Sequence, residues 1–273
     1  MASLDRVDRS ADPSIIRADH LEVAYKDKVV WHDATFEVRR GEFVALIGPN
    51  GAGKTTLFRL LLGLRRPTRG SLTVFGSTPR RGNRRIGYVP QRHTVDNDTH
   101  VAAEVLVRLG ASGYRWGPQF TFRHEKAAAR EALEAVNATE LGGTSLGSLS
   151  GGELQRIFLA EALVGNPEML LLDEPLSNLD IRRARELVEV VHSLVRHRRV
   201  TTLLVAHDIN PLIECLDKVI YIANGHVATG TPEEVLTSSS LTELYGVPVE
   251  VLHDSRGNIV IVGGEDPHEP ERP

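Results

Sequence analysis

The sequence predicts an α/β protein with a parallel-sheet core, an antiparallel β subdomain and an α-helical subdomain. Short apolar runs alternate with segments rich in helix formers along most of the chain. FVALI at 43–47 is continuously apolar and leads into a glycine-rich loop, which is typical of a parallel strand buried on both faces. The two segments before it alternate apolar and polar residues, which is typical of strands with one exposed face. A chain of 273 residues can bury such a core in one large domain with a subdomain.

The first hundred residues are expected to supply many of the strands. Residues 1–14 form a polar leader, and strands follow in IIRADHLEVAY and KVVWHDATFEV, joined by a short turn. The segment KTTLFRLLLGL predicts a helix that ends near Gly63 and Pro67. SLTVFG and RRIGYVP predict two further strands.

The middle of the chain has a helical composition. We expect a helical subdomain at 92–148, in which the strong helix formers of 123–136 make one helix. The α/β alternation then resumes with helix ELQRIFLAEALVG, strand MLLL, helix IRRARELVEVVHSLVRH and strands TTLLVA and KVIYIA. The segment PLIECLDKV, just before the last of these strands, is expected to be helical.

The C-terminal end differs from the rest. The main domain is expected to span 15–245, and 246–262 resembles a β-hairpin with a glycine-containing turn. The polar, proline-containing stretch 263–273 is predicted to be disordered. The sequence of the hairpin does not reveal its role.

Composition and charge argue against several classes of protein. The single cysteine, Cys215, allows no intrachain disulfide, which fits a reducing compartment. No apolar run exceeds five residues, far short of the ~20 that cross a bilayer, and no apolar signal-peptide core is present. The net charge of −4 argues against nucleic-acid binding. Residues 1–100 nevertheless carry 17 Lys and Arg against 11 Asp and Glu, as a polyphosphate site would favour.

GPNGAGKTT at 48–56 has the pattern of a phosphate-binding loop between a strand and a helix. Its glycines let successive backbone amides surround a β-phosphate. We expect Lys54 to neutralise β- and γ-phosphate oxygens and the Thr55 hydroxyl to coordinate Mg²⁺. The predicted ATP-binding residues of this loop are Gly48, Pro49, Asn50, Gly51, Ala52, Gly53, Lys54, Thr55 and Thr56.

A second element supports this interpretation. EMLLLDEP at 168–175 is an apolar strand that ends in two acids, so Asp173 and Glu174 emerge at the carboxyl end of a parallel strand, where ligands of open α/β sheets bind. Adjacent residues point in different directions. Asp173 is therefore expected to support the Mg²⁺ shell, and Glu174 to polarise an attacking water as a general base.

LSGGELQR at 149–156 lies between these two elements, and with it the chain resembles the ATP-binding cassette (ABC) ATPases over about residues 15–250. The resemblance implies a P-loop NTPase cassette with a RecA-like core that binds ATP and Mg²⁺ and hydrolyses ATP. It assigns Gln91 to Mg²⁺ and the attacking water, and His207 to the γ-phosphate as a catalytic switch residue. Tyr25 matches the family's adenine-stacking aromatic, although a tyrosine there is also compatible with packing at a strand end.

The resemblance also implies a second copy of the chain. In this family two cassettes pack head to tail, and the LSGG segment of one closes over ATP held by the other. The residues expected to contact the partner's nucleotide are Ser150, Gly151, Gly152 and, in the D-loop SNLD, Asp180. A serine hydroxyl, glycine amides and the positive end of a helix suit a γ-phosphate.

ABC cassettes also serve DNA repair and translation, but this chain is more similar to the transporter ATPases. Repair ATPases insert long coiled coils between their motifs, which the 59 residues from Gln91 to Ser150 do not contain, and translation factors usually fuse two cassettes. A transporter ATPase is expected to bind separate transmembrane permease subunits at the cytoplasmic face of the membrane. The helical subdomain at 92–148 would receive a short permease helix, and a substrate-binding protein would take part indirectly.

The cargo is suggested by less diagnostic segments. YVPQRHTVD and the stretch from AHDIN to VPVEV are most similar to ATPases of manganese and zinc uptake systems. VAAEVLVRLGASGYRW departs from the TVxDVVxxGR pattern that is more common in that subfamily. Import of iron-siderophores or cobalamin is the alternative.

Overall fold

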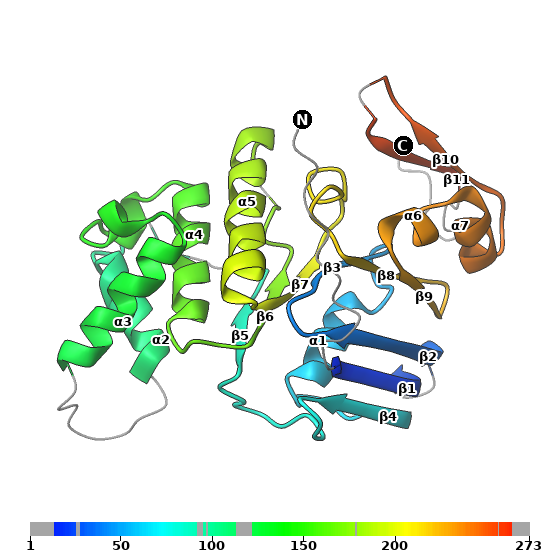
Figure 1. Cartoon of the computed structure of the whole chain (residues 1–273), viewed down its shortest axis with the longest axis horizontal. Coiled ribbons are helices and arrows are strands. Elements are labelled where there is room, and N and C mark those ends of the chain that lie inside the picture. The colour runs from blue at the N-terminus through cyan, green and yellow to red at the C-terminus, as the bar shows by residue number, and fades with distance from the viewer. Residues whose placement is uncertain are drawn as a thin grey trace.

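The computed structural model describes residues 14–25, 28–91, 95–96, 98–112, 122–177, 179–255 and 257–263. Its centre is a six-stranded sheet in the order β5-β6-β7-β3-β8-β9 (Figure 1). The first five strands of that order are parallel and β9 is antiparallel. The six strands are β3 (Phe43–Ile47), β5 (Ile86–Val89), β6 (Met169–Asp173), β7 (Thr201–Val205), β8 (Lys218–Ala223) and β9 (His226–Gly230).

A smaller antiparallel sheet covers one face of the central sheet. It contains β1 (Ser14–Tyr25), β2 (Lys28–Arg39) and β4 (Arg69–Val74) in the order β2-β1-β4, with helix α1 (Lys54–Leu61) between the two sheets. Every second residue of the central strands points into this layer, as Val44, Leu46 and Leu171 do. Apolar side chains of β1, β2 and α1 complete this core.

Helices cover the opposite face of the central sheet. Helix α4 (Gly151–Leu163) packs against β5 and α5 (Ile181–Arg198) packs against β7, whereas α2 (Ala103–Ser112) and α3 (Phe122–Ala135) pack on α4 farther from the sheet (Figure 1). The alternate residues Phe43, Ala45 and Leu170 point into this second core. Because both faces of β3 are buried, its sequence is continuously apolar. The predicted fold class is thereby confirmed.

Two short 3₁₀ helices, Thr139–Leu141 and Leu146–Ser148, connect α3 to α4. None of the helices within the described ranges is long and apolar enough to cross a membrane.

The C-terminal part forms a separate small layer beside β8 and β9 (Figure 1). Helices α6 (Pro232–Val235) and α7 (Ser238–Tyr245) lead into β10 (Val249–His253) and β11 (Ile259–Gly263), which pair antiparallel with each other. The predicted disorder of 263–273 concerns residues that, except for Gly263, lie outside the described part of the chain. The same holds for 1–13 of the predicted leader, while Ser14 already belongs to β1.

One predicted helix is wrong. The segment around Cys215 consists of turns, in which Leu212 N donates to Ile209 O at 2.8 Å and Cys215 N donates to Leu212 O at 2.8 Å. Only residues 206–217 separate β7 from β8, which leaves little length for a regular helix. Burial raises the pKa of the Cys215 thiol, so this side chain behaves as a packed apolar group.

Candidate functional site

The register of the parallel strands brings the predicted motifs to one edge of the sheet. Leu46 of β3 and Asp173 of β6 both pair with Val205 of β7. The P-loop follows β3, Glu174 follows β6 and His207 follows β7, so all three begin at the same level. Val89 of β5 pairs with Leu172, which places Gln91 opposite Glu174. Segments far apart in sequence therefore meet at the carboxyl edge of the sheet, where ligands of such folds bind.

The P-loop has a conformation that depends on its glycines. Gly48 has a φ of 144°, and a Cβ there would lie 2.0 Å from the Ile222 carbonyl oxygen. Gly53, the N-cap of α1, has a φ of 106° in the left-handed region and gives no side-chain cap. The first amides of α1 are therefore left for a ligand, and Thr55 is exposed beside them. The first turn of α1 contains no acidic residue.

Lys54 is buried, and its ammonium group is held by the loop itself. Nζ donates to the carbonyl oxygens of Gly48 at 2.7 Å and Pro49 at 2.9 Å. Burial lowers the pKa of Lys54, and the nearby carboxylates of Glu174 and Asp173 oppose that shift. The structure thus brings Lys54 close to both predicted acids.

Asp173 is the more buried of the two acids. Its pKa is raised, first by burial and then by the charge of Glu174. The Tyr88 hydroxyl lies 3.5 Å from Asp173 Oδ2, and the pKa of Tyr88 is raised by its own burial and by Asp173. The carboxyl group therefore has a polar neighbour from β5 that the sequence did not predict.

Glu174 connects the predicted catalytic residues. His207 Nε2 lies 2.8 Å from Glu174 Oε1, and Gln91 Nε2 donates to Glu174 Oε2 at 2.5 Å. The Glu174 backbone has a φ of 52°, which is unusual for a residue with a side chain. Ser177 stabilises this turn, because its N–H and its hydroxyl donate to the Glu174 carbonyl oxygen at 3.1 and 2.8 Å. Strained backbone of this kind is found at functional sites.

Tyr25 lies next to the P-loop helix. Its hydroxyl is 3.4 Å from Thr56 Oγ1 and accepts from Arg59 Nη1 at 3.3 Å. The Arg65 guanidinium lies 3.6 Å from the ring centroid and covers one face of the ring. The side chain is 37% exposed. Because Arg65 covers one face of the ring, a base can stack only on the other face.

The second predicted phosphate-binding segment lies apart from the first. Within the described residues, no hydrogen bond or ion pair joins Ser150, Gly151 or Gly152 to the P-loop. Glu153 Oε2 accepts from Ser150 N at 2.8 Å and from Ser150 Oγ at 2.6 Å. Gly151 is exposed with open space around it. The N-terminus of α4 is thus capped by its own carboxylate.

Asp180 and the N-terminus of α4 lie near each other. Asp180 is the N-cap of α5, and its Oδ1 accepts from Arg183 N at 2.9 Å. A Cβ on Gly152 would lie 3.2 Å from Arg183 Cδ, so Gly152 leaves room for that side chain. The four residues predicted to act on a partner's nucleotide therefore form one surface.

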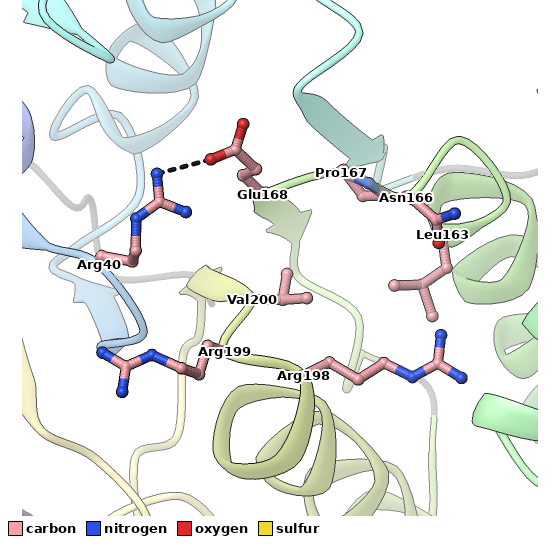
Figure 2. A pocket seen from close by; sticks show the side chains of 8 residues that line it. All are labelled: Arg40, Leu163, Asn166, Pro167, Glu168, Arg198, Arg199 and Val200. Atoms are coloured by element: carbon pink, nitrogen blue, oxygen red, sulfur yellow. Dashed lines mark ion pairs between the residues drawn. The ribbon is translucent and has the colours of Figure 1, made fainter.

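A hollow of about 330 Å³ lies at the opposite edge of the sheet (Figure 2). Glu168 precedes β6 and Val200 precedes β7, so this hollow is at the amino ends of the strands. Arg40 Nη2 pairs with Glu168 at 2.6 Å, and Arg198 Nη1 pairs with Glu131 at 3.3 Å. Two of the three arginines that line this hollow are therefore paired with carboxylates of the chain.

The fold and this edge of the sheet define a P-loop nucleotide-binding protein. The ABC transporter family matches residues 31–177, and the chain belongs to it. It binds ATP and hydrolyses it as the ATPase of a transporter.

Relatives match along most of the chain. The zinc transport system ATP-binding protein TroB of Treponema pallidum is 34% identical over 249 residues, 91% of this chain and 93% of that protein. The zinc import ATP-binding protein ZnuC of Pseudomonas syringae pv. syringae is 35% identical over 258 residues, 90% and 92% of the two chains. The manganese transport system ATP-binding protein MntB of Bacillus subtilis is 32% identical over 243 residues, 88% and 95%.

Solved structures agree with the fold. A chain from an ABC transporter described as metal-chelate type, in an inward-facing conformation, superposes with a TM-score of 0.77 at 26% identity, covering 92% of this chain and 98% of that one. An ATP-binding cassette in its ADP conformation gives a TM-score of 0.74 at 22% identity, covering 85% and 98%.

Sequence reasoning missed Tyr88, Ser177 and Glu153. Glu153 had a recognisable signal, because a serine followed three residues later by a glutamate at a helix start is a capping box. Tyr88 acts through a contact that depends on the fold, and no local pattern marks it. Ser177 lies in the SNLD segment, but its bonds to Glu174 depend on the folded turn.

Proposed function

We propose that this chain is the ATP-hydrolysing subunit of an importer for divalent metal ions, zinc or manganese. This assignment of the transported ion is supported by relatives named for zinc and manganese transport, which match about nine-tenths of the chain at 32–35% identity. The metal-chelate type transporter has a lower identity, 26%, so import of iron-siderophores or cobalamin is less well supported.

Cellular uptake tests the cargo. In cells that lack this gene, uptake of radioactive zinc or manganese should fall at least about tenfold, and the wild-type gene but not the Lys54→Ala variant should restore it. The uptake of a ferric siderophore and of cobalamin serves as the control. If uptake of the ferric siderophore or of cobalamin falls while uptake of zinc and manganese does not, the metal-ion proposal is wrong.

The nucleotide is proposed to bind at the P-loop, with the amides of Gly51 to Thr55 around the phosphates. Lys54 would exchange its two carbonyl partners for β- and γ-phosphate oxygens, which form stronger charge-assisted bonds. Adenine would stack on the free face of Tyr25. The position of the Tyr25 hydroxyl beside Thr56 supports this role.

The residues proposed for Mg²⁺ offer the donors that this ion prefers. Thr55, Gln91 and Asp173 supply a hydroxyl, an amide and a carboxylate, all oxygen ligands. In the described part of the chain no cluster of three His, Cys, Asp or Glu residues is suited to a metal, which fits an ion held jointly with phosphates. When bound, Mg²⁺ neutralises the charge that develops on the phosphates.

Glu174 is proposed as the general base. Its carboxylate would accept a proton from the attacking water while Gln91 orients that water. In the structure His207 and Gln91 each occupy one oxygen of Glu174. Nucleotide binding would release His207 toward the γ-phosphate and so free one oxygen for water.

A second copy is proposed to complete the site. The segment of Ser150, Gly151 and Gly152, of which Gly151 is exposed, would close with the exposed Asp180 over ATP bound to the partner's P-loop. The absence of bonds between this segment and its own P-loop supports an action in trans.

A groove of about 690 Å³ between β5, α2 and α4 is proposed to receive a permease helix. Ile86, Leu106 and Phe158 give it an apolar lining, and β5 is an edge strand. Glu161 also lines it, and burial raises the pKa of this carboxyl group. A basic residue on the permease helix would compensate Glu161. We therefore propose that the chain binds Mg²⁺, forms a dimer and attaches to the membrane through its permease.

A further inference from the structure

The C-terminal hairpin is fixed to the main domain through α7. Thr242 Oγ1 accepts from Val249 N at 3.0 Å, and Ser238 Oγ accepts from Val251 N at 2.8 Å. Helix α7 is tied to the central sheet in turn, because the hydroxyls of Tyr245 and Tyr221 lie 3.0 Å apart. The position of β10 is therefore set by the sheet.

The other strand of the hairpin has an anchor of a different kind. Asn210 Oδ1 accepts from Ile259 N at 2.7 Å, and Asn210 Nδ2 donates to Ile259 O at 3.0 Å. The carboxamide offers one donor and one acceptor, so it pairs with Ile259 as the backbone of a neighbouring strand would. Ile259 is the first residue of β11. This contact joins segments 49 residues apart.

Asn210 belongs to the loop that carries His207. Asp208 Oδ1 accepts from Asn210 N at 2.9 Å and from Asn210 Nδ2 at 2.8 Å, which forms a tight turn after His207. The neighbouring Ile209 is buried in the core. The His207 side chain itself is 49% exposed, so core packing does not fix it. Its position depends on the backbone of this loop and on its contact with Glu174, whose Oε1 lies 2.8 Å from His207 Nε2.

We infer that Asn210 is a positioning residue for ATP hydrolysis, which clamps the loop of His207 to the C-terminal hairpin. The function inferred for the hairpin is to hold the loop of His207 in place through a contact outside the nucleotide site. This inference rests on the proposed catalytic role of His207. It does not depend on the cargo.

Kinetics of the purified full-length chain test the clamp. Asn210→Ala removes both bonds to Ile259. We expect kcat for ATP to fall about tenfold, since small displacements of catalytic groups have large effects, while KM for ATP stays within about twofold. A merely structural role would instead lower the melting temperature and leave kcat of the folded fraction unchanged.

A second variant tests whether Asn210 acts through the hairpin. Ile259→Pro removes the N–H that donates to Asn210, at the first position of an edge strand, where proline is tolerated. If the two groups act as one unit, Asn210→Ala with Ile259→Pro should lower kcat no further than Asn210→Ala alone.

Asn83→Ala is the matched control, because this turn asparagine precedes β5 at the opposite edge of the sheet. It should keep wild-type kcat.

Three outcomes overturn an assignment. Wild-type kcat in Asn210→Ala, or effects of the two variants that multiply in the double variant, would disprove the clamp. His207→Ala separates this failure from a failure of the proposed site. If His207→Ala keeps full turnover, the catalytic role of His207 is wrong and the clamp falls with it.

Discussion

Two helices of this chain begin at a glycine-rich segment suited to phosphate, yet their N-termini differ. Helix α1 starts at Gly53, which has no side chain to cap it, and its first turn contains no acid. Helix α4 starts at Ser150, and Glu153 in its first turn accepts from both the amide and the hydroxyl of that serine. An uncapped N-terminus attracts an anion, whereas a carboxylate in the first turn repels one.

This difference suggests an order of events. The end of α1 is ready for nucleotide in a single chain, and Lys54 lies beside it. The end of α4 is already satisfied by Glu153 and is expected to accept phosphate only when a second chain presents it. The first site would bind nucleotide, and the second would sense that it is bound.

The largest effect is expected at α1. Lys54→Ala should lower the affinity for ATP by at least about a hundredfold, because two charge-assisted bonds to phosphate are lost. Isothermal titration calorimetry measures this, and Lys126→Ala on the exposed surface of α3 is the control. Unchanged affinity in Lys54→Ala would remove the basis of the comparison between the two helices.

A large effect on assembly, but not on binding, is expected at α4. Ser150→Arg introduces bulk and charge at the surface proposed to meet the partner's ATP. With Glu174→Gln as a background that traps ATP, the variant should bind nucleotide with an affinity within about threefold of its parent. It should nevertheless remain monomeric on gel filtration. Normal ATP-dependent dimers would show that α4 does not act in trans.

The sequence predicted the fold class and marked the candidate site residues, because both depend on local patterns. FVALI was recognisable as a strand buried on both faces, and MLLL and TTLLVA were recognisable as strands. Their parallel arrangement places Lys54, Glu174 and His207 at one edge. Motif order alone could not reveal the left-handed backbone of Glu174, since a glutamate has no preference for it.

The sequence did not predict contacts between residues that are far apart in the chain. The pairing of Asn210 with Ile259 joins two segments with no shared periodicity, so nothing in the sequence links them. The composition of the segment around Cys215 is typical of a helix, but the short span between β7 and β8 contains successive turns instead. In this segment the tertiary structure, and not the local helix propensity, determines the backbone conformation.

The smallest expected effect concerns the cap of α4 itself. The Ser150 hydroxyl and amide lower the pKa of Glu153 below its ordinary value. Such a carboxylate stabilises the fold above its unfolded pKa of about 4.5, and this contribution is lost as the pH falls through the lower folded value. Because the group is partly exposed and screened by solvent, Glu153→Gln should lower the free energy of unfolding by only about 0.5 kcal/mol at pH 7.

Urea unfolding at several pH values between 7 and 3.5 measures this contribution. The difference between wild type and Glu153→Gln should shrink below about pH 4.5, because the wild-type carboxyl group then takes up a proton and resembles the neutral amide. Glu140→Gln, in the exposed 3₁₀ turn before α4, serves as the control and should show no difference at any pH. A difference that stays constant with pH would mean that shape, and not charge, closes the N-terminus of α4. The contrast with α1 would then lose its electrostatic basis.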